Sequence, residues 1–125
     1  QDTTQPYGFA RVPAAVYSIP GMIQGTCQTE SGEIVLSQSF GANSSHLYVY
    51  SQDNLVQTGT YLADGVDVAL YCLDNTSLTD DLLAPPMLEG IESKDGQVYV
   101  TDEAASNKYL FGKLYGAGHV YSLTL

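Results

Sequence analysis

The residues best suited to bind a ligand lie in the segment 104–118. Aromatic faces stack on sugar rings or on peptide side chains, and lysines pair with carboxylates or phosphates. Long loops on a rigid β scaffold are a common place for such binding groups. The segment therefore predicts a glycan- or peptide-binding loop, and the alternative is an internal hairpin whose aromatic rings pack on the scaffold. The candidate ligand-binding residues are Lys108, Tyr109, Phe111, Lys113 and Tyr115.

The two histidines and one acidic pair are further candidates for chemistry. His46 and His119 each stand two residues before a tyrosine in similar surroundings, which favours a shared structural bond between adjacent strands over a catalytic pair. Asp102 and Glu103 are neighbours at the end of a predicted strand and would face opposite ways, so we expect them to be solvated or to anchor a loop. Nucleophile-elbow, P-loop and metalloprotease motifs are absent, so we expect no catalytic residue.

We expect these groups to be positioned by a scaffold that is built from an internal sequence repeat. Pro20–Thr26 and Pro85–Ile91 are similar in sequence, and each is followed by a turn glycine (Gly32, Gly96) and then by a β-rich run. A β-rich repeat of this size is typical of stacked sheet units such as propeller blades. We therefore expect an all-β fold of antiparallel, four-stranded, blade-like sheets forming a partial β-propeller. A small β-sandwich or barrel is the alternative.

The predicted single domain, 1–125, divides into four parts. These are an N-terminal edge strand (1–20), a first blade (21–61), a connecting segment with an extra strand (62–86) and a second, incomplete blade (87–125).

Three details of this division can be checked directly. Leu55–Tyr61 is expected to be the fourth strand of the first blade, and 75–83 a short helical turn. The second blade shows three strands. Because an open sheet edge invites pairing, we expect Ala10–Ile19, the rest of a propeller or partner chains to complete it.

The second copy of the repeat resembles a known family. Met87–Ile91, followed by Asp95–Asp102 and His119–Leu123, resembles the blade consensus of bacterial six-bladed propellers of the SMP-30/gluconolactonase and NHL-like groups. The resemblance covers residues 20–51 and 85–125. It implies the C-terminal two-blade portion of a secreted propeller.

The resemblance also implies a metal ligand. In the gluconolactonase-like group, a Glu in an E-G-P segment is a ligand of the central divalent metal, and Glu89 matches that position. Ile91 stands where the family has Pro, and the first unit has Gln24 where the second has Glu89. The implied ion is a divalent cation such as calcium.

Composition narrows the partners and the compartment. Hydrophobic residues make up 44% of the 125 residues, so the chain should fold. Its net charge of −10 disfavours nucleic acid and anionic membrane surfaces as partners. Without an apolar run long enough to span a membrane, no membrane insertion is expected. The resemblance to secreted propellers implies a secreted or cell-surface location. Cys27 and Cys72 either form one disulfide or remain two buried thiols.

These observations leave three functional hypotheses. The first is a non-enzymatic binding or interaction module that needs no cofactor and whose ligand is a glycan or a peptide. The second is a metal-dependent lactonase-like or hydrolase propeller that uses Glu89. The third is a structural portion of a larger assembly.

Overall fold

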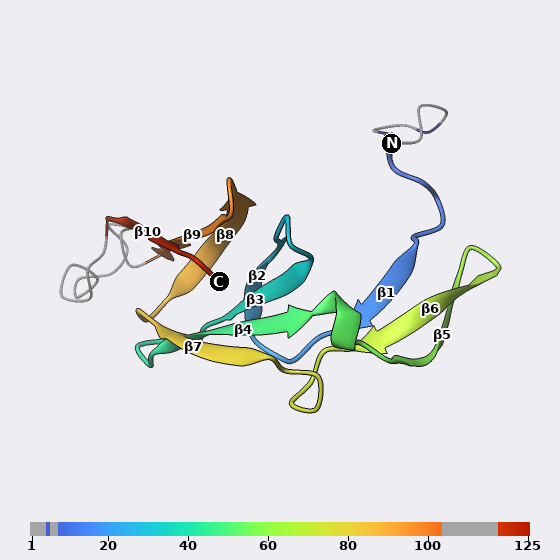
Figure 1. Cartoon of the computed structure of the whole chain (residues 1–125), viewed down its shortest axis with the longest axis horizontal. Coiled ribbons are helices and arrows are strands. Elements are labelled where there is room, and N and C mark those ends of the chain that lie inside the picture. Colours follow the sequence, from blue (N-terminus) through green and yellow to red (C-terminus); the bar gives the residue numbers. More distant parts are fainter. Residues whose placement is uncertain (1–4, 6–7, 104–117) are drawn as a thin grey trace.

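The computed structural model describes residue 5 and residues 8–103 and 118–125, which form an all-β structure of three open sheets, as predicted (Figure 1). A short 3₁₀ helix, η2 (Gln52–Asn54), follows the fourth strand. Within the described residues no helix could span a membrane. The strands are β1 (Ala15–Ser18), β2 (Ile23–Gln28), β3 (Glu33–Gln38), β4 (Ser45–Ser51), β5 (Gln57–Ala63), β6 (Val66–Cys72), β7 (Asp80–Ala84), β8 (Leu88–Lys94), β9 (Gln97–Asp102) and β10 (Val120–Leu123).

The central sheet, which we call the first unit, has the strand order β2-β3-β4-β7 and is antiparallel throughout. The prediction that Leu55–Tyr61 supplies its fourth strand is wrong, because β7 pairs with β4 instead. β7 also occupies part of the segment 75–83, where a helical turn was predicted. Leu82 and Ala84 of β7 pack against the core, so burial of these side chains explains why this segment takes the edge.

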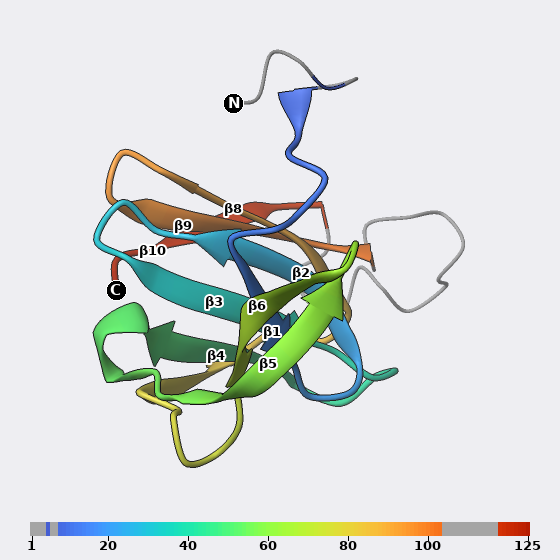
Figure 2. The same cartoon turned by 90° about the vertical axis from the view of Figure 1, so that its right-hand side faces the viewer.

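Another sheet has the strand order β1-β6-β5. It lies on one flank of the first unit, in front of it in Figure 2. β5 and β6 form a hairpin whose turn residues, Asp64 and Gly65, have φ values of 50° and 80°. Asp-Gly favours this two-residue turn, so Gln57–Ala63 pairs with β6 rather than with β4. The predicted N-terminal edge strand exists as β1, but it pairs in parallel with β6 and not with β10.

The second unit is the antiparallel sheet β8-β9-β10, and it repeats the backbone of the first unit. The first strand of each unit has a register shift at the same point. In β2 the shift lies between Ile23 and Gly25, and in β8 it lies between Leu88 and Ile91. The sequence repeat is therefore also a structural repeat.

The turns that lead into β2 and β8 share a second backbone feature. Met22 and Met87 both have a φ of 65°, a left-handed conformation that is uncommon for a residue with a side chain. The carbonyl of Met22 accepts a hydrogen bond from the backbone N–H of Ser39 (3.2 Å), and that of Met87 accepts one from Glu103 (2.8 Å). Because both copies share this turn, we attribute it to the scaffold.

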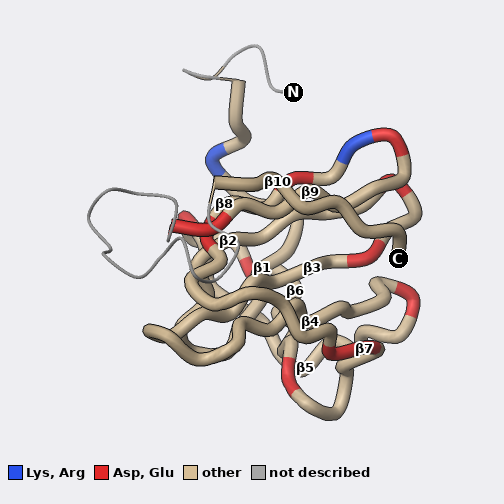
Figure 3. Tube along the Cα trace, turned by 90° about the vertical axis from the view of Figure 1, so that its left-hand side faces the viewer, with Lys and Arg blue, Asp and Glu red and all other residues tan. Residues whose placement is uncertain are grey.

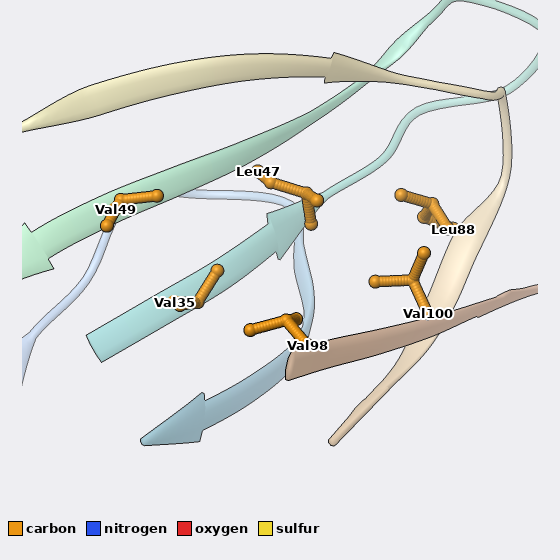
Figure 4. Packing of buried hydrophobic residues seen from close by; sticks show 6 residues of the cluster. All are labelled: Val35, Leu47, Val49, Leu88, Val98 and Val100. Atoms are coloured by element: carbon orange, nitrogen blue, oxygen red, sulfur yellow. The ribbon is translucent and has the colours of Figure 1, made fainter. Parts of the chain in front are cut away.

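The two units pack against each other through one apolar cluster, shown in Figure 4. Its buried side chains come from both units and point toward one another. The first unit contributes Val35, Leu47 and Val49, and the second contributes Leu88, Val98 and Val100.

The face of the second unit that makes this contact, which we call the stacking face, also exists in the first unit. By strand register, Leu88, Val98 and Val100 correspond to Ile23, Ile34 and Leu36. In the first unit these residues belong to a second apolar cluster on the opposite side of the sheet. That cluster is covered by Leu55, Leu73 and Leu78, which lie outside the two units.

Candidate functional site

A pocket of about 300 Å³ lies where the first and second units meet. We call it the inter-unit pocket. It uses equivalent positions of the two copies: Gln24 and Glu89 lie at the strand bulges, and Ser39 and Glu103 directly follow β3 and β9. The lining residues are Gln24, Ser39, Phe40, Gly41, Met87, Glu89 and Glu103.

The backbone of Glu89 is held in place by the first unit. A Cβ atom added to Gly25 would lie 2.4 Å from the carbonyl oxygen of Glu89, so β2 and β8 can approach this closely only with glycine at position 25. Ser37 donates a hydrogen bond from Oγ to the same carbonyl oxygen at 3.3 Å. The Oγ of Ser45 accepts a hydrogen bond from the backbone N–H of Leu88 at 3.2 Å. Two fully buried serines thus fix the start of β8 at the pocket.

The pocket lining offers groups suited to a polar ligand with an apolar face. Glu89 and Glu103 supply carboxylates, Gln24 a carboxamide and Ser39 a hydroxyl. The ring of Phe40 is 64% exposed and is available for stacking. No Lys or Arg from the described part of the chain lines the pocket. The pocket thus offers both hydrogen-bonding groups and one aromatic face to a bound molecule.

Glu89, the candidate metal ligand, shares the pocket with Glu103. Within residues 8–103 and 118–125, however, no three His, Cys, Asp or Glu side chains are grouped so that they could hold a metal ion. Calcium takes about six to eight oxygen ligands. The described residues at this pocket therefore do not fit a calcium site by themselves.

The histidines have structural contacts, as predicted for His46. Its Nδ1 lies 2.7 Å from Oδ1 of Asp81, which joins β4 to β7, and its ring stacks on Tyr48 with ring centroids 5.6 Å apart. In the second unit, the ring centroids of His119 and Tyr121 lie 6.2 Å apart. Neither histidine lines the inter-unit pocket.

The acidic pair is divided between two environments. Asp102 is only 7% exposed, so the expectation that it is solvated is wrong; it follows the buried Val98 and Val100 on the same side of β9. Glu103 lines the pocket, and its backbone N–H donates a hydrogen bond to the carbonyl oxygen of Met87.

The predicted ligand-binding loop is not part of the described structure. Lys108, Tyr109, Phe111, Lys113 and Tyr115 lie outside the described residues.

Sequence reasoning did not single out Ser39, Phe40 and Gly41 as site residues. A usable signal was present: Ser39 aligns with Glu103, and Gln24 aligns with Glu89, so one pocket collects two of the positions at which the copies differ.

The two cysteines are free thiols, so of the two alternatives the disulfide is not formed. Cys27 lies on β2 against the inter-unit cluster. Burial, assisted by the negative charge of Glu92, raises the pKa of the Cys27 thiol to about 11. The thiol is therefore protonated at neutral pH and is a weak nucleophile. Cys72 Sγ lies 3.4 Å from the Oγ1 atom of Thr58.

Acidic residues outnumber basic ones in the described part of the chain, and many of them lie at turns and strand ends along the trace in Figure 3. Two of the chain's cationic residues are described: Arg11 forms an ion pair with Asp64 at 2.9 Å, and Lys94 lies 4.0 Å from Asp95.

We compared the chain with protein-family models, with curated proteins and with solved structures. None of the three comparisons gives a match.

Proposed function

We propose that this chain is a secreted or cell-surface binding module, built as part of a β-propeller, that holds a glycan at the inter-unit pocket without chemically changing it. The observation that carries the proposal is the pocket lining. It combines the exposed ring of Phe40 with the carboxylates of Glu89 and Glu103 and the carboxamide of Gln24. An aromatic face packs on the C–H face of a sugar ring, while carboxylates and amides accept or donate hydrogen bonds to its hydroxyls.

The loop predicted from sequence belongs to the same proposal. Residues 104–117 begin directly after Glu103, which lines the pocket. We propose that Tyr109, Phe111 and Tyr115 add aromatic contacts to the glycan and that Lys108 and Lys113 bind its acidic substituents. A peptide ligand is the alternative that the experiment below also covers.

The experiment is a calorimetric titration of the chain with a panel of neutral and acidic oligosaccharides and short peptides. We expect one oligosaccharide class to bind and Phe40→Ala to weaken it by roughly tenfold, which corresponds to the loss of one stacking contact. Phe9→Ala is the matched control, because Phe9 is 78% exposed and does not line the pocket. Equal affinities of the Phe40→Ala variant and the wild type, or binding of peptides alone, would contradict the glycan proposal.

A second candidate function is a metal-dependent lactonase-like or hydrolase activity that uses Glu89. The observation in its favour is that Glu89 and Glu103 share one pocket. If calcium binds there, it should raise the melting temperature of the wild type and leave that of Glu89→Gln unchanged. Absence of a calcium-dependent shift in chelator-treated wild-type protein rules out a calcium-dependent enzyme and leaves the glycan proposal standing.

A further inference from the structure

The outer edge of β10 is open in the described structure. In the first unit, β4 pairs with β3 on one side and with β7 on the other. Its counterpart in the second unit, β10, pairs with β9, and no described strand pairs with its other edge. An unpaired edge presents a row of N–H and C=O groups to which another strand can add.

The open edge also lacks the features that usually protect one. Val120–Leu123 contains no charged residue and no proline, and Val120 is 65% exposed. β7, the outer strand of the first unit, differs in both respects: it begins with Asp80 and Asp81 and is followed directly by two prolines. Charges and prolines at an edge discourage further pairing, so β7 is protected and β10 is not.

A strand suited to the β10 edge exists elsewhere in the chain. β1 precedes Met22 at the same distance at which β7 precedes Met87, so β1 is the repeat counterpart of β7. Leu82 of β7 packs against the inter-unit core, whereas its counterpart in β1, Tyr17, is 36% exposed. Ile19, the counterpart of the core-packed Ala84, is 48% exposed.

β1 has one edge available for pairing. The carbonyl of Ser18 accepts a hydrogen bond from the backbone N–H of Leu73 at 2.9 Å, so the backbone groups of Ser18 point toward the β6 side. Successive residues of a strand point their N–H and C=O groups to opposite sides. The backbone groups of Tyr17 therefore point to the other edge, where no described strand lies.

We propose that β1 of one copy of this chain pairs antiparallel with β10 of a second copy, in the register that β7 adopts on β4. In the first unit Leu47 pairs with Leu82, so the same register places Tyr17 of one copy opposite Val120 of the other. Neither strand contains a charged residue. The pairing therefore brings no like charges into direct contact, although the whole chain has a net charge of −10. Pairing covers the exposed side chains of Tyr17, Ile19 and Val120.

The partner has to be a second copy rather than the same chain. β1 is paired with β6, and the sheet that contains them lies on the flank of the first unit opposite the second unit (Figure 1). Donor and acceptor edges on opposite flanks create a head-to-tail contact. Such contacts build a ring if the rotation closes and an open filament if it does not.

The test measures the solution mass of the whole chain by analytical ultracentrifugation as its concentration rises. We expect the wild type to exceed the monomer mass. Tyr17→Pro removes the N–H that points to the open edge, and proline is accepted in an edge strand. Val120→Lys places a charge on the accepting edge. Each variant alone should stay monomeric, and an equal mixture of the two should form a dimer and nothing larger, because each supplies one intact edge.

Leu83→Lys is the control, since Leu83 is 74% exposed on the protected strand β7 and its substitution should leave the assembly unchanged. Circular dichroism checks that each variant is folded. Should Tyr17→Pro fail to fold, Val120→Lys tests the acceptor edge by itself. A wild type that is monomeric at all concentrations, or assemblies that survive Val120→Lys, would overturn the proposal.

Discussion

The first and second units share their stacking face, but their opposite faces differ. In the first unit the opposite face is apolar and covered: Val35, Leu47 and Val49 are at most 4% exposed. Their counterparts in the second unit are Tyr99, Val120 and Ser122. Ser122 is exposed and Val120 is 65% exposed. The repeat thus keeps an apolar stacking face in both copies and changes the opposite face, which only the first copy uses to pack against another unit.

This difference separates scaffold from function. Positions that match in both copies, such as the left-handed methionines and the bulges of β2 and β8, maintain strand geometry. Positions that differ are free to serve a purpose in one copy. Glu89 replaces Gln24 in the inter-unit pocket, and the less apolar face of the second unit accompanies an open strand edge. If this distinction is correct, equivalent substitutions in the two units should have unequal effects.

The largest expected effect is at the two equivalent glycines. Gly25→Ala should destabilise the protein by about 4 kcal/mol, because the new Cβ would lie 2.4 Å from the backbone oxygen of Glu89, and backbone cannot move aside without separating the units. Gly90→Ala should cost about 2 kcal/mol, because its Cβ would meet a side-chain atom, Oγ1 of Thr101, at 2.4 Å. Unfolding by urea measures both changes.

A second substitution distinguishes the two causes. Thr101→Ala removes the Oγ1 atom and should restore most of the stability lost in Gly90→Ala, while it should leave Gly25→Ala unimproved. Thr101 is exposed, so its substitution alone should change stability by less than about 0.5 kcal/mol. Equal losses at the two glycines, or rescue of both, would show that the close approach of β2 to β8 is not what separates the two copies.

The next effect comes from exchanging residues between the opposite faces. Val49→Ser gives the first unit the residue found at the equivalent position of the second. It should lower the free energy of unfolding by about 3 kcal/mol, because Val49 is buried in the inter-unit cluster and a hydroxyl buried there would lose its hydrogen bonds to water. Ser122→Val makes the reverse change on an exposed position and should alter the free energy of unfolding by less than about 0.5 kcal/mol. Comparable losses from both substitutions would mean that the second unit's opposite face is covered in solution.

The comparison also shows which features the sequence could predict. The spacing of Met22 and Met87, and of His46 and His119, was enough to predict equivalent turns and strands, because the backbone of a repeat follows its local pattern. The β6 strand followed from its own apolar run, Val68–Cys72.

Strand partnership and the pocket depended on distant contacts. Leu55–Tyr61 and Asp80–Ala84 both follow β4 in the chain, and the burial of Leu82 and Ala84 in the core explains why the more distant segment pairs with it. Phe40 and Glu89 are far apart in the sequence and line one pocket because Gly25 lets β2 and β8 approach closely. No local pattern in the sequence reports such a meeting.

The smallest expected effect compares the two hairpin turns, and it depends on pH. In the first unit, hydrogen bonds from Ser31 and Thr29 hold the pKa of Glu33 below its ordinary value of 4.5. A carboxyl group with a lowered pKa stabilises the fold above its unfolded-state pKa, and this stabilisation disappears as the pH falls through the folded-state pKa. Ser31→Ala should therefore cost less than about 1 kcal/mol at neutral pH and nothing in strong acid.

The second unit provides the matched control for this pH effect. Its turn, Asp95-Gly96, has φ values of 53° and 73° and is shaped by backbone conformation, which Asn tolerates as well as Asp does. Asp95→Asn should thus change stability by less than about 0.5 kcal/mol at either pH. Urea unfolding of both variants at neutral and acidic pH measures the difference. If the cost of Ser31→Ala persists in acid, the hydroxyl stabilises the turn independently of the Glu33 charge, and the two turns differ in length rather than in electrostatics.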